Sequence, residues 1–177
     1  GGDVAALRGN DPPKIDIEHT SFGTRIFALH NSPNGKKYLR INNFVFPSGA
    51  TPSTSGGPGG YQGRWYVPID DFSHCRFEFF YRHSEPLNTE ALRKNRAENV
   101  APDNRHIRRP ENRYLQDREE LKRGDSYTGM GQHFPSQDAF AIETQGAVQD
   151  RTKEHLGSTD VVIIEVRKAL LKAIKKM

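Results

Sequence analysis

Two neighbouring segments of the chain alternate between apolar and polar side chains, and a short turn at residues 70–73 separates them. The alternating apolar residues are Trp65, Val67 and Ile69 in the first segment and Cys75, Phe77, Phe79 and Tyr81 in the second. A period of two is the pattern of a β-strand, whose successive side chains point to opposite faces. The sequence therefore predicts an antiparallel hairpin here, and a fold built around an antiparallel sheet.

The chain before this hairpin predicts further strands of the same kind. Short β-prone runs separated by the turn-like residues 21–23 and 33–35 occupy residues 14–20, 24–30 and 38–46. Residues 48–60 are dominated by Ser, Pro, Thr and Gly, a composition that predicts a mobile loop between strands.

The second half of the chain predicts helices. Residues 89–99 predict a short polar helix, and residues 115–122 a charged one. A better helix is expected to begin near Ser136 as N-cap and to end at Gly146. The last helix opens at Ser158 or Thr159 and runs to the terminus. Its apolar stripe, which suits packing on a sheet, consists of Ile163, Val166, Leu170, Ala173, Ile174 and Met177. These elements predict an α+β fold, with one antiparallel sheet packed around a long C-terminal helix.

Composition narrows the function classes. The 177 residues suffice for one domain, with no apolar run near the roughly 20 residues that cross a bilayer and no signal-peptide pattern at residues 1–4. Cys75 is the only cysteine, which excludes an internal disulfide and agrees with a reducing cytoplasm. The net charge of +4 comes largely from residues 93–109 and 168–176. Acidic residues dilute the first stretch and a helix C-terminus favours the second, so neither predicts a nucleic-acid site.

Asp138 is the most informative polar residue. At helical spacing it shares a face with Ala141, Ile142 and Gln145, the face expected to point inward. A carboxylate facing an apolar interior costs several kcal/mol unless it is paired, protonated or bound to a cation. The alternative is an acid of the first helical turn, stabilised by the helix dipole by about 0.3–1 kcal/mol. Periodicity leaves both interpretations open.

The chain contains three motifs in this order: residues 60–71 (GYQGRWYVPIDD), 112–119 (NRYLQDRE) and 137–160 (QDAFAIETQGAVQDRTKEHLGSTD). Together they resemble the C-terminal catalytic part of the large terminal subunit of phthalate dioxygenase-type Rieske oxygenases. The resemblance implies a helix-grip (Bet v 1/START-like) fold for residues 1–177 and non-haem Fe(II) held by two His and one Asp. Asp138 matches the carboxylate ligand.

The same resemblance implies cofactors and partners. These are a [2Fe–2S] Rieske cluster, NAD(P)H electrons delivered through a separate reductase, O₂, an aromatic substrate that is typically an acid, and an assembly that is often trimeric. The chain departs from the family pattern because no Asp–His–His motif precedes its first predicted strand and no Cys/His pairs could hold a Rieske cluster. We therefore expect the Rieske domain and the two His ligands to be absent from this chain, which alone should be inactive.

The histidines differ in what their positions predict. His74, at the end of a predicted strand pair, is a candidate substrate-pocket residue, with a solvated turn histidine as the alternative. His133 is too far from Asp138 for the same helical face, and the others are expected to be structural or superficial. Trp65, Phe77 and Phe79 are expected in the core rather than as an aromatic-substrate platform. A second hypothesis for the whole chain is a non-catalytic helix-grip module that binds a hydrophobic ligand.

Overall fold

A computed structural model describes residues 11–33, 35–52, 60–83, 85–131 and 133–177. The chain divides into two compact units. The sheet unit comprises Gly1–Leu87 and Lys153–Met177, and the helical unit comprises Asn88–Thr152.

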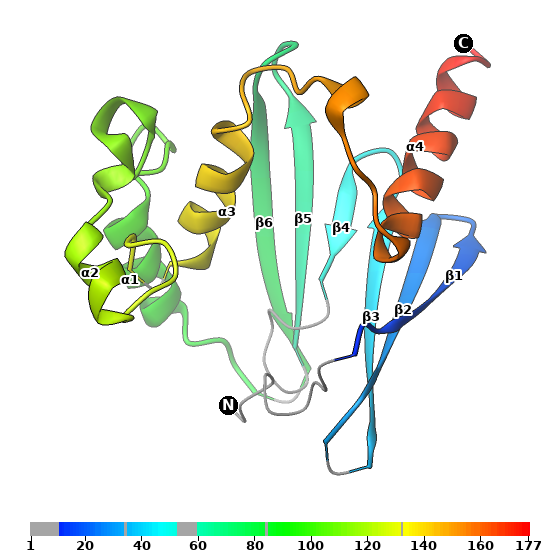
Figure 1. The fold of residues 1–177 in the computed structure, drawn as a ribbon, viewed down its shortest axis with the longest axis horizontal. Coiled ribbons are helices and arrows are strands. Elements are labelled where there is room, and N and C mark those ends of the chain that lie inside the picture. Colours follow the sequence, from blue (N-terminus) through cyan, green and yellow to red (C-terminus); the bar gives the residue numbers. More distant parts are fainter. Residues whose placement is uncertain (1–10, 34, 53–59, 84, 132) are drawn as a thin grey trace. The chain divides into compact units, whose positions relative to one another are not determined.

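The sheet unit contains a six-stranded antiparallel sheet whose strands follow one another in sequence order (Figure 1). The strands are β1 (Lys14–Thr20), β2 (Gly23–Asn31), β3 (Lys37–Val45), β4 (Gly49–Thr51), β5 (Gly60–Pro68) and β6 (His74–Arg82). Together with the helices this confirms the α+β class and agrees with the helix-grip expectation. The predicted loop at 48–60 is wrong in part, because β4 lies within it. Residues 53–59 of that loop lie outside the described residues.

Directly opposed residues of paired strands share a face, so the register defines two faces of the sheet. We call them the inner and the outer face. The inner face contains the buried residues Thr24, Ala28, His30 and Gln62, with exposed fractions of 3–8%. The outer face contains Leu39, Ile41, Trp65, Val67, Phe77 and Phe79, all exposed by 39–58%.

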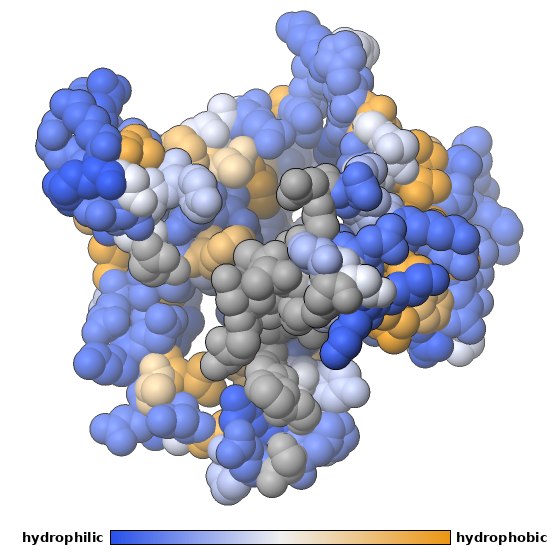
Figure 2. Space-filling model, turned by 60° about the horizontal axis from the view of Figure 1, so that its bottom comes forward, coloured by the Kyte–Doolittle hydropathy of each residue, from blue (hydrophilic) through white to orange (hydrophobic). Residues whose placement is uncertain are grey.

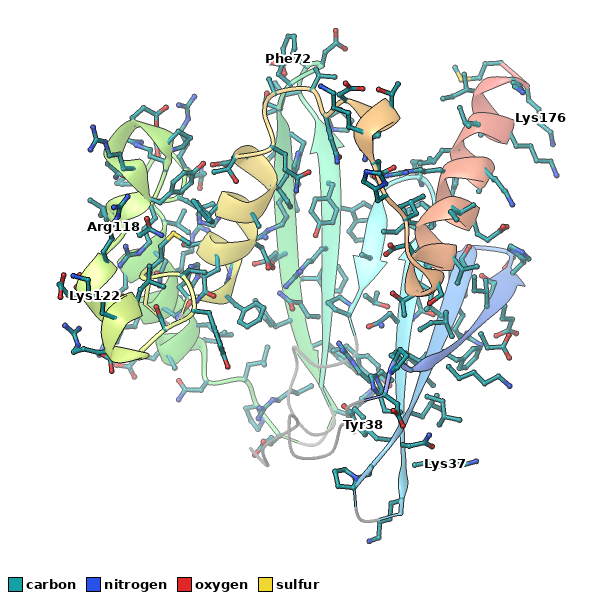
Figure 3. All side chains as sticks on the ribbon, in the orientation of Figure 1. Lys37, Tyr38, Phe72, Arg118, Lys122 and Lys176 are labelled. Atoms are coloured by element: carbon teal, nitrogen blue, oxygen red, sulfur yellow. The ribbon has the colours of Figure 1, made fainter. Side chains whose placement is uncertain are left out.

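The aromatic residues of the β5–β6 hairpin therefore lie on the less covered face. The hairpin itself is confirmed, with Trp65 opposite Phe77 and with Phe72 in its turn (Figure 3). The prediction that Trp65, Phe77 and Phe79 are core residues is wrong for this chain, since nothing in the sheet unit covers them fully. Figure 2 shows other apolar side chains, in orange, at the surface among hydrophilic ones.

The C-terminal helix α4 (Val161–Ile174) belongs to the same unit (Figure 1). A 3-10 turn, Ser158–Asp160, precedes it where the sequence predicts the helix to open. On this helix, a hydrogen bond from Lys168 lowers the pKa of Glu165. The predicted apolar stripe is half-buried in the middle of α4, whereas Ile163, Ile174 and Met177 are exposed.

The helical unit contains α1 (Thr89–Asn99), α2 (Arg118–Arg123) and α3 (Phe134–Glu143). Helix α1 has the predicted bounds. Helix α2 begins three residues later than predicted, because the Asp117 side chain accepts the amide of Glu119 and caps it there. Among the residues that the structure describes, no helix combines the length and the apolar character needed to span a bilayer.

Candidate functional site

Helix α3 begins two residues earlier than the predicted cap at Ser136. Pro135 stands in its first turn, where a missing amide costs nothing, and the ring of His133 accepts the backbone amide of Ser136 at 3.3 Å. The His133 ring also contacts the Ser136 hydroxyl, with 2.7 Å between Nδ1 and Oγ. His133 is therefore a helix cap. The helix ends at Glu143, before the predicted stop at Gly146.

One face of α3, which we call its front, carries Asp138, Ala141 and Ile142, whereas Gln145 lies beyond the last helical residue, Glu143. The predicted sharing of a face is confirmed for these three residues by their helical spacing, and all three are exposed; it is wrong for Gln145, which the helix does not include. The predicted inward direction is wrong for this unit, since the front is the uncovered side. The Asp138 carboxylate makes no hydrogen bond or ion pair with any residue that the structure describes, so its oxygen lone pairs are available to a ligand.

The opposite face of α3, its back, anchors the helix within the unit. Ser136 is fully buried on this face. The ring of Phe140 meets the ring of Tyr114 edge to face, with centroids 5.0 Å apart. The Tyr114 hydroxyl donates to Glu143 Oε2 at 2.8 Å. One buried tyrosine thus contacts the back of α3 at two positions a turn apart.

Tyr114 lies in a turn with an unusual backbone. Arg113, Tyr114 and Leu115 have φ values of +53°, +57° and +47°, a conformation that costs non-glycine residues about 1–3 kcal/mol each. The Arg108 guanidinium supports the turn from one side, because its Nη1 donates to the carbonyls of Tyr114 at 3.0 Å and Leu115 at 2.7 Å. Burial, followed by the hydrogen bond to Glu143, raises the pKa of Tyr114 well above its usual range, so the phenol stays a donor.

In the sheet unit, the inner face of the β5–β6 hairpin holds a charged cluster. Glu78 Oε1 lies 3.1 Å from Arg64 Nε and 3.4 Å from Arg76 Nε. The Gln62 amide nitrogen donates to the same oxygen at 3.1 Å, and the Gln62 carbonyl oxygen accepts from Arg64 at 3.3 Å. These half-buried groups fix the two strands to each other with polar contacts where a simple apolar core would otherwise lie.

His74 stands at one end of this same face. It begins β6, lies opposite Pro68 and is exposed. Its ring meets the ring of Tyr66 edge to face at 5.4 Å between centroids. The structure thus places His74 in the sheet unit and Asp138 in the helical unit, each with its own supporting contacts.

Fe(II) sites of the two-His-one-carboxylate type need three side chains in one place. Within the described ranges, no group of three or more His, Cys, Asp or Glu residues could hold a metal ion. The carboxylate of Asp138, whose oxygens have no partner among the described residues, has the chemistry that the single carboxylate position of such a site requires.

The pairing of Tyr114 with Glu143 was not expected from the sequence. Tyr114 lies in the motif at residues 112–119 and Glu143 in the motif at residues 137–160. The two positions are 29 residues apart, and no spacing rule relates positions at that separation. The Arg64–Glu78–Arg76 cluster was missed for a different reason. In the sequence its members are simply polar residues that alternate with apolar ones along two strands, a pattern that a solvated face would equally explain.

The comparisons with known proteins agree with the resemblance. Residues 7–177 match a family model described as LigXa C-terminal domain like. The oxygenase subunit of phthalate 4,5-dioxygenase from Pseudomonas putida is 34% identical over 174 residues, which cover 92% of this chain and 38% of that protein. The chain thus spans well under half the length of this curated relative. It belongs to the LigXa C-terminal domain-like family, a C-terminal part of Rieske-type oxygenases.

Proposed function

We propose that this chain is the C-terminal part of the catalytic domain in the large terminal subunit of an aromatic-ring oxygenase. In this proposal residues 1–177 belong to the domain of the mononuclear iron. The Rieske [2Fe–2S] domain and the two His ligands stand in the part of the subunit that this chain does not include. The observation that carries the proposal is the exposed carboxylate of Asp138, which has no ion-pair partner among the described residues and stands on an anchored helix, in a chain of this family.

Asp138 is assigned as the carboxylate ligand of non-haem Fe(II). When bound, the iron supplies the activation of O₂ for insertion into the ring of an aromatic substrate. The protein supplies the position of the carboxylate, through the contacts that hold the back of α3. It also supplies negative charge at the ligand position, since Asp138 has no cation beside it among the described residues.

His74 is assigned to the substrate pocket. Its contact with Tyr66 orients the ring, while its exposure leaves the imidazole nitrogens free to bind a polar group on the substrate. The relative's name makes an aromatic acid the first substrate class to try. In the full enzyme His74→Ala should raise KM with little loss of bound iron, whereas equal losses of iron and activity would show a structural role.

The wider proposal follows the family. Electrons come from NAD(P)H through a separate reductase and the Rieske cluster, and the subunits associate, with a trimer as the expected form. The lone Cys75 agrees with function in the reducing cytoplasm.

Replacing Asp138 in the full-length subunit tests the site. Asp138→Ala removes the anionic ligand, and Asp138→Asn removes the charge with little change in shape. Both should lower iron affinity by more than the 10–100-fold that the loss of an outer partner typically costs. The visible absorbance of the Rieske cluster should persist, since that cluster has its own ligands.

The matched control is Glu98→Ala, which removes an exposed acid from α1 of the same unit. It should keep iron and activity. Full mononuclear iron in both Asp138 variants would overturn the assignment and favour the alternative, a helix-grip module that binds a hydrophobic ligand without metal.

A further inference from the structure

We propose that Tyr114 is a positioning residue for the iron site, and that it acts by fixing the rotation of helix α3 so that Asp138 is presented at the metal. This inference rests on the proposed role of Asp138. It assigns a function to the turn at Arg113–Leu115, which is otherwise an expensive conformation with no evident purpose.

The contacts of Tyr114 lie directly behind Asp138. At 100° per residue, Phe140 and Glu143 stand about 200° and 140° around the helix from Asp138, on either side of the point opposite it. Tyr114 holds Phe140 through its ring and Glu143 through its hydroxyl. Two contacts that flank the back of a helix oppose rotation in both directions, which a single contact could not do.

The geometric requirement is strict. Side-chain atoms lie about 5–6 Å from the axis of an α-helix, so a rotation of only about 10° moves a carboxylate oxygen by about 1 Å. Metal–ligand distances tolerate deviations of about 0.2 Å. The front residues Asp138, Ala141 and Ile142 are exposed, so among the described residues they provide little packing to set this rotation. The position of the Asp138 carboxylate therefore depends on the contacts at the back of the helix.

The turn that carries Tyr114 is maintained against strain. Three consecutive residues in the left-handed region persist only where the surroundings determine them strongly. Here the surroundings are the Arg108 guanidinium and the near-complete burial of the Tyr114 side chain, which is 5% exposed. A relaxed turn could fill the same volume, but it would present the phenol elsewhere. The strain is thus explained by the direction in which Tyr114 must point.

The test uses the full-length subunit and measures two quantities: Fe(II) affinity, by competition with a chelator, and stability, by urea unfolding. Tyr114→Phe keeps the ring contact and removes the hydroxyl. We expect it to weaken iron binding about tenfold, the low end for outer-shell partners, because Tyr114 acts through the helix. Glu143→Ala should have the same effect, and Glu143→Gln, which retains an oxygen acceptor, should restore affinity close to that of the parent.

The double variant Tyr114→Phe/Glu143→Ala should bind iron no more weakly than either single variant, because each substitution removes the same hydrogen bond between Tyr114 and Glu143. Leu92→Ala is the matched control, because it truncates a half-buried side chain in the same unit, on a helix that carries neither Tyr114 nor Asp138. It should lower stability and leave iron affinity unchanged.

Two results overturn the inference. One is a Tyr114→Phe protein that loses stability as Leu92→Ala does but keeps the parent's iron affinity, which would make Tyr114 merely structural. The other is a Glu143→Gln protein as weak as Glu143→Ala. Failure of the proposed function is distinct, because there the Asp138 variants themselves would retain iron.

Discussion

Removing the Arg108 side chain should loosen the turn that presents Tyr114. Arg108 Nη1 donates to two carbonyl oxygens, at 2.7 and 3.0 Å, and these are the carbonyls of two residues with positive φ. Arg108→Leu keeps most of the aliphatic bulk and removes both donors. The two carbonyls then lose their partner, and the backbone is free to relax towards commoner dihedral angles.

The size of the effect follows from these contacts. A hydrogen bond from a charged donor contributes about 1.5–3 kcal/mol. Leu115 is exposed, so water can replace the donor to its carbonyl, whereas Tyr114 is buried. The bond to the Leu115 carbonyl then contributes a small part, and the bond to the Tyr114 carbonyl contributes the low end of this range. Together they give a loss of about 2 kcal/mol, which corresponds to about a 30-fold change in the equilibrium constant for opening of the turn.

Native-state hydrogen exchange measures that opening directly. The amide of Tyr114 donates to Arg109 at 2.9 Å and the amide of Gln116 to Arg113 at 3.2 Å, so both report on the turn. Both should exchange about 30-fold faster in Arg108→Leu. Arg105→Leu is the control, because it removes the same charge from an exposed side chain nearby. If the two variants raised exchange by similar factors, the support from Arg108 would be refuted.

Three further predictions concern other parts of the chain. Gly63→Ala should destabilise the sheet by about 1 kcal/mol in urea unfolding, because a Cβ at this position would overlap the Phe79 ring and displace it from Trp65. In a Phe79→Ala background this loss of stability should vanish. Hydrogen bonds from the Phe72 amide and the Ser73 hydroxyl lower the pKa of Asp70. The ionised carboxylate therefore stabilises the turn above the ordinary aspartate pKa, and this stabilisation is lost as the pH falls through the lowered pKa of Asp70 in the folded protein. Asp70→Asn should abolish this pH dependence in an NMR titration of the turn. The 177-residue chain alone should bind no stoichiometric iron by metal analysis, since one carboxylate cannot hold Fe(II) against water, and one tight iron per chain would show that other residues are ligands.

The strands were predictable because their signals are local. Residues 14–20 form a strand with the predicted bounds, and the alternation in residues 75–82 gives the correct division of side chains between two faces. Strand β4 was missed because three residues in a Ser, Pro and Gly-rich segment carry no pattern. Their conformation is set by pairing with β3 and β5, which a single sequence does not display.

The helix ends were less predictable. Helix α3 was expected to begin at Ser136, a good capping residue by type, yet His133 supplies the cap and Ser136 is buried inside the helix. Capping preferences rank residues without stating which competing acceptor is nearer in space. The early start also explains why Ser136 contributes to the back of the helix.

Which face is covered cannot be obtained from alternation or helical spacing. Both patterns state which residues share a face, and both were right: Trp65 shares one with Phe77 and Phe79, and Asp138 shares one with Ile142. In each case the shared face is exposed in the described chain, with Ile142 65% and Phe77 58% accessible. Periodicity assigns the apolar side to the interior, but the structure shows that other elements cover the opposite side.

The exposure of Asp138 also changes the reason for assigning it to a metal. An inward-facing carboxylate, as the sequence predicts, would need a cation to offset its lost hydration. The exposed carboxylate of Asp138 keeps its hydration in this unit and has no such need. What remains is positional: its oxygens have no described partner, and the helix that carries it is held from behind by Phe140 and Glu143. Asp138 is not an acid of the first helical turn, because α3 begins at Phe134. An ordinary surface acid has no need of such an anchor, whereas a metal ligand that must be placed to about 0.2 Å does.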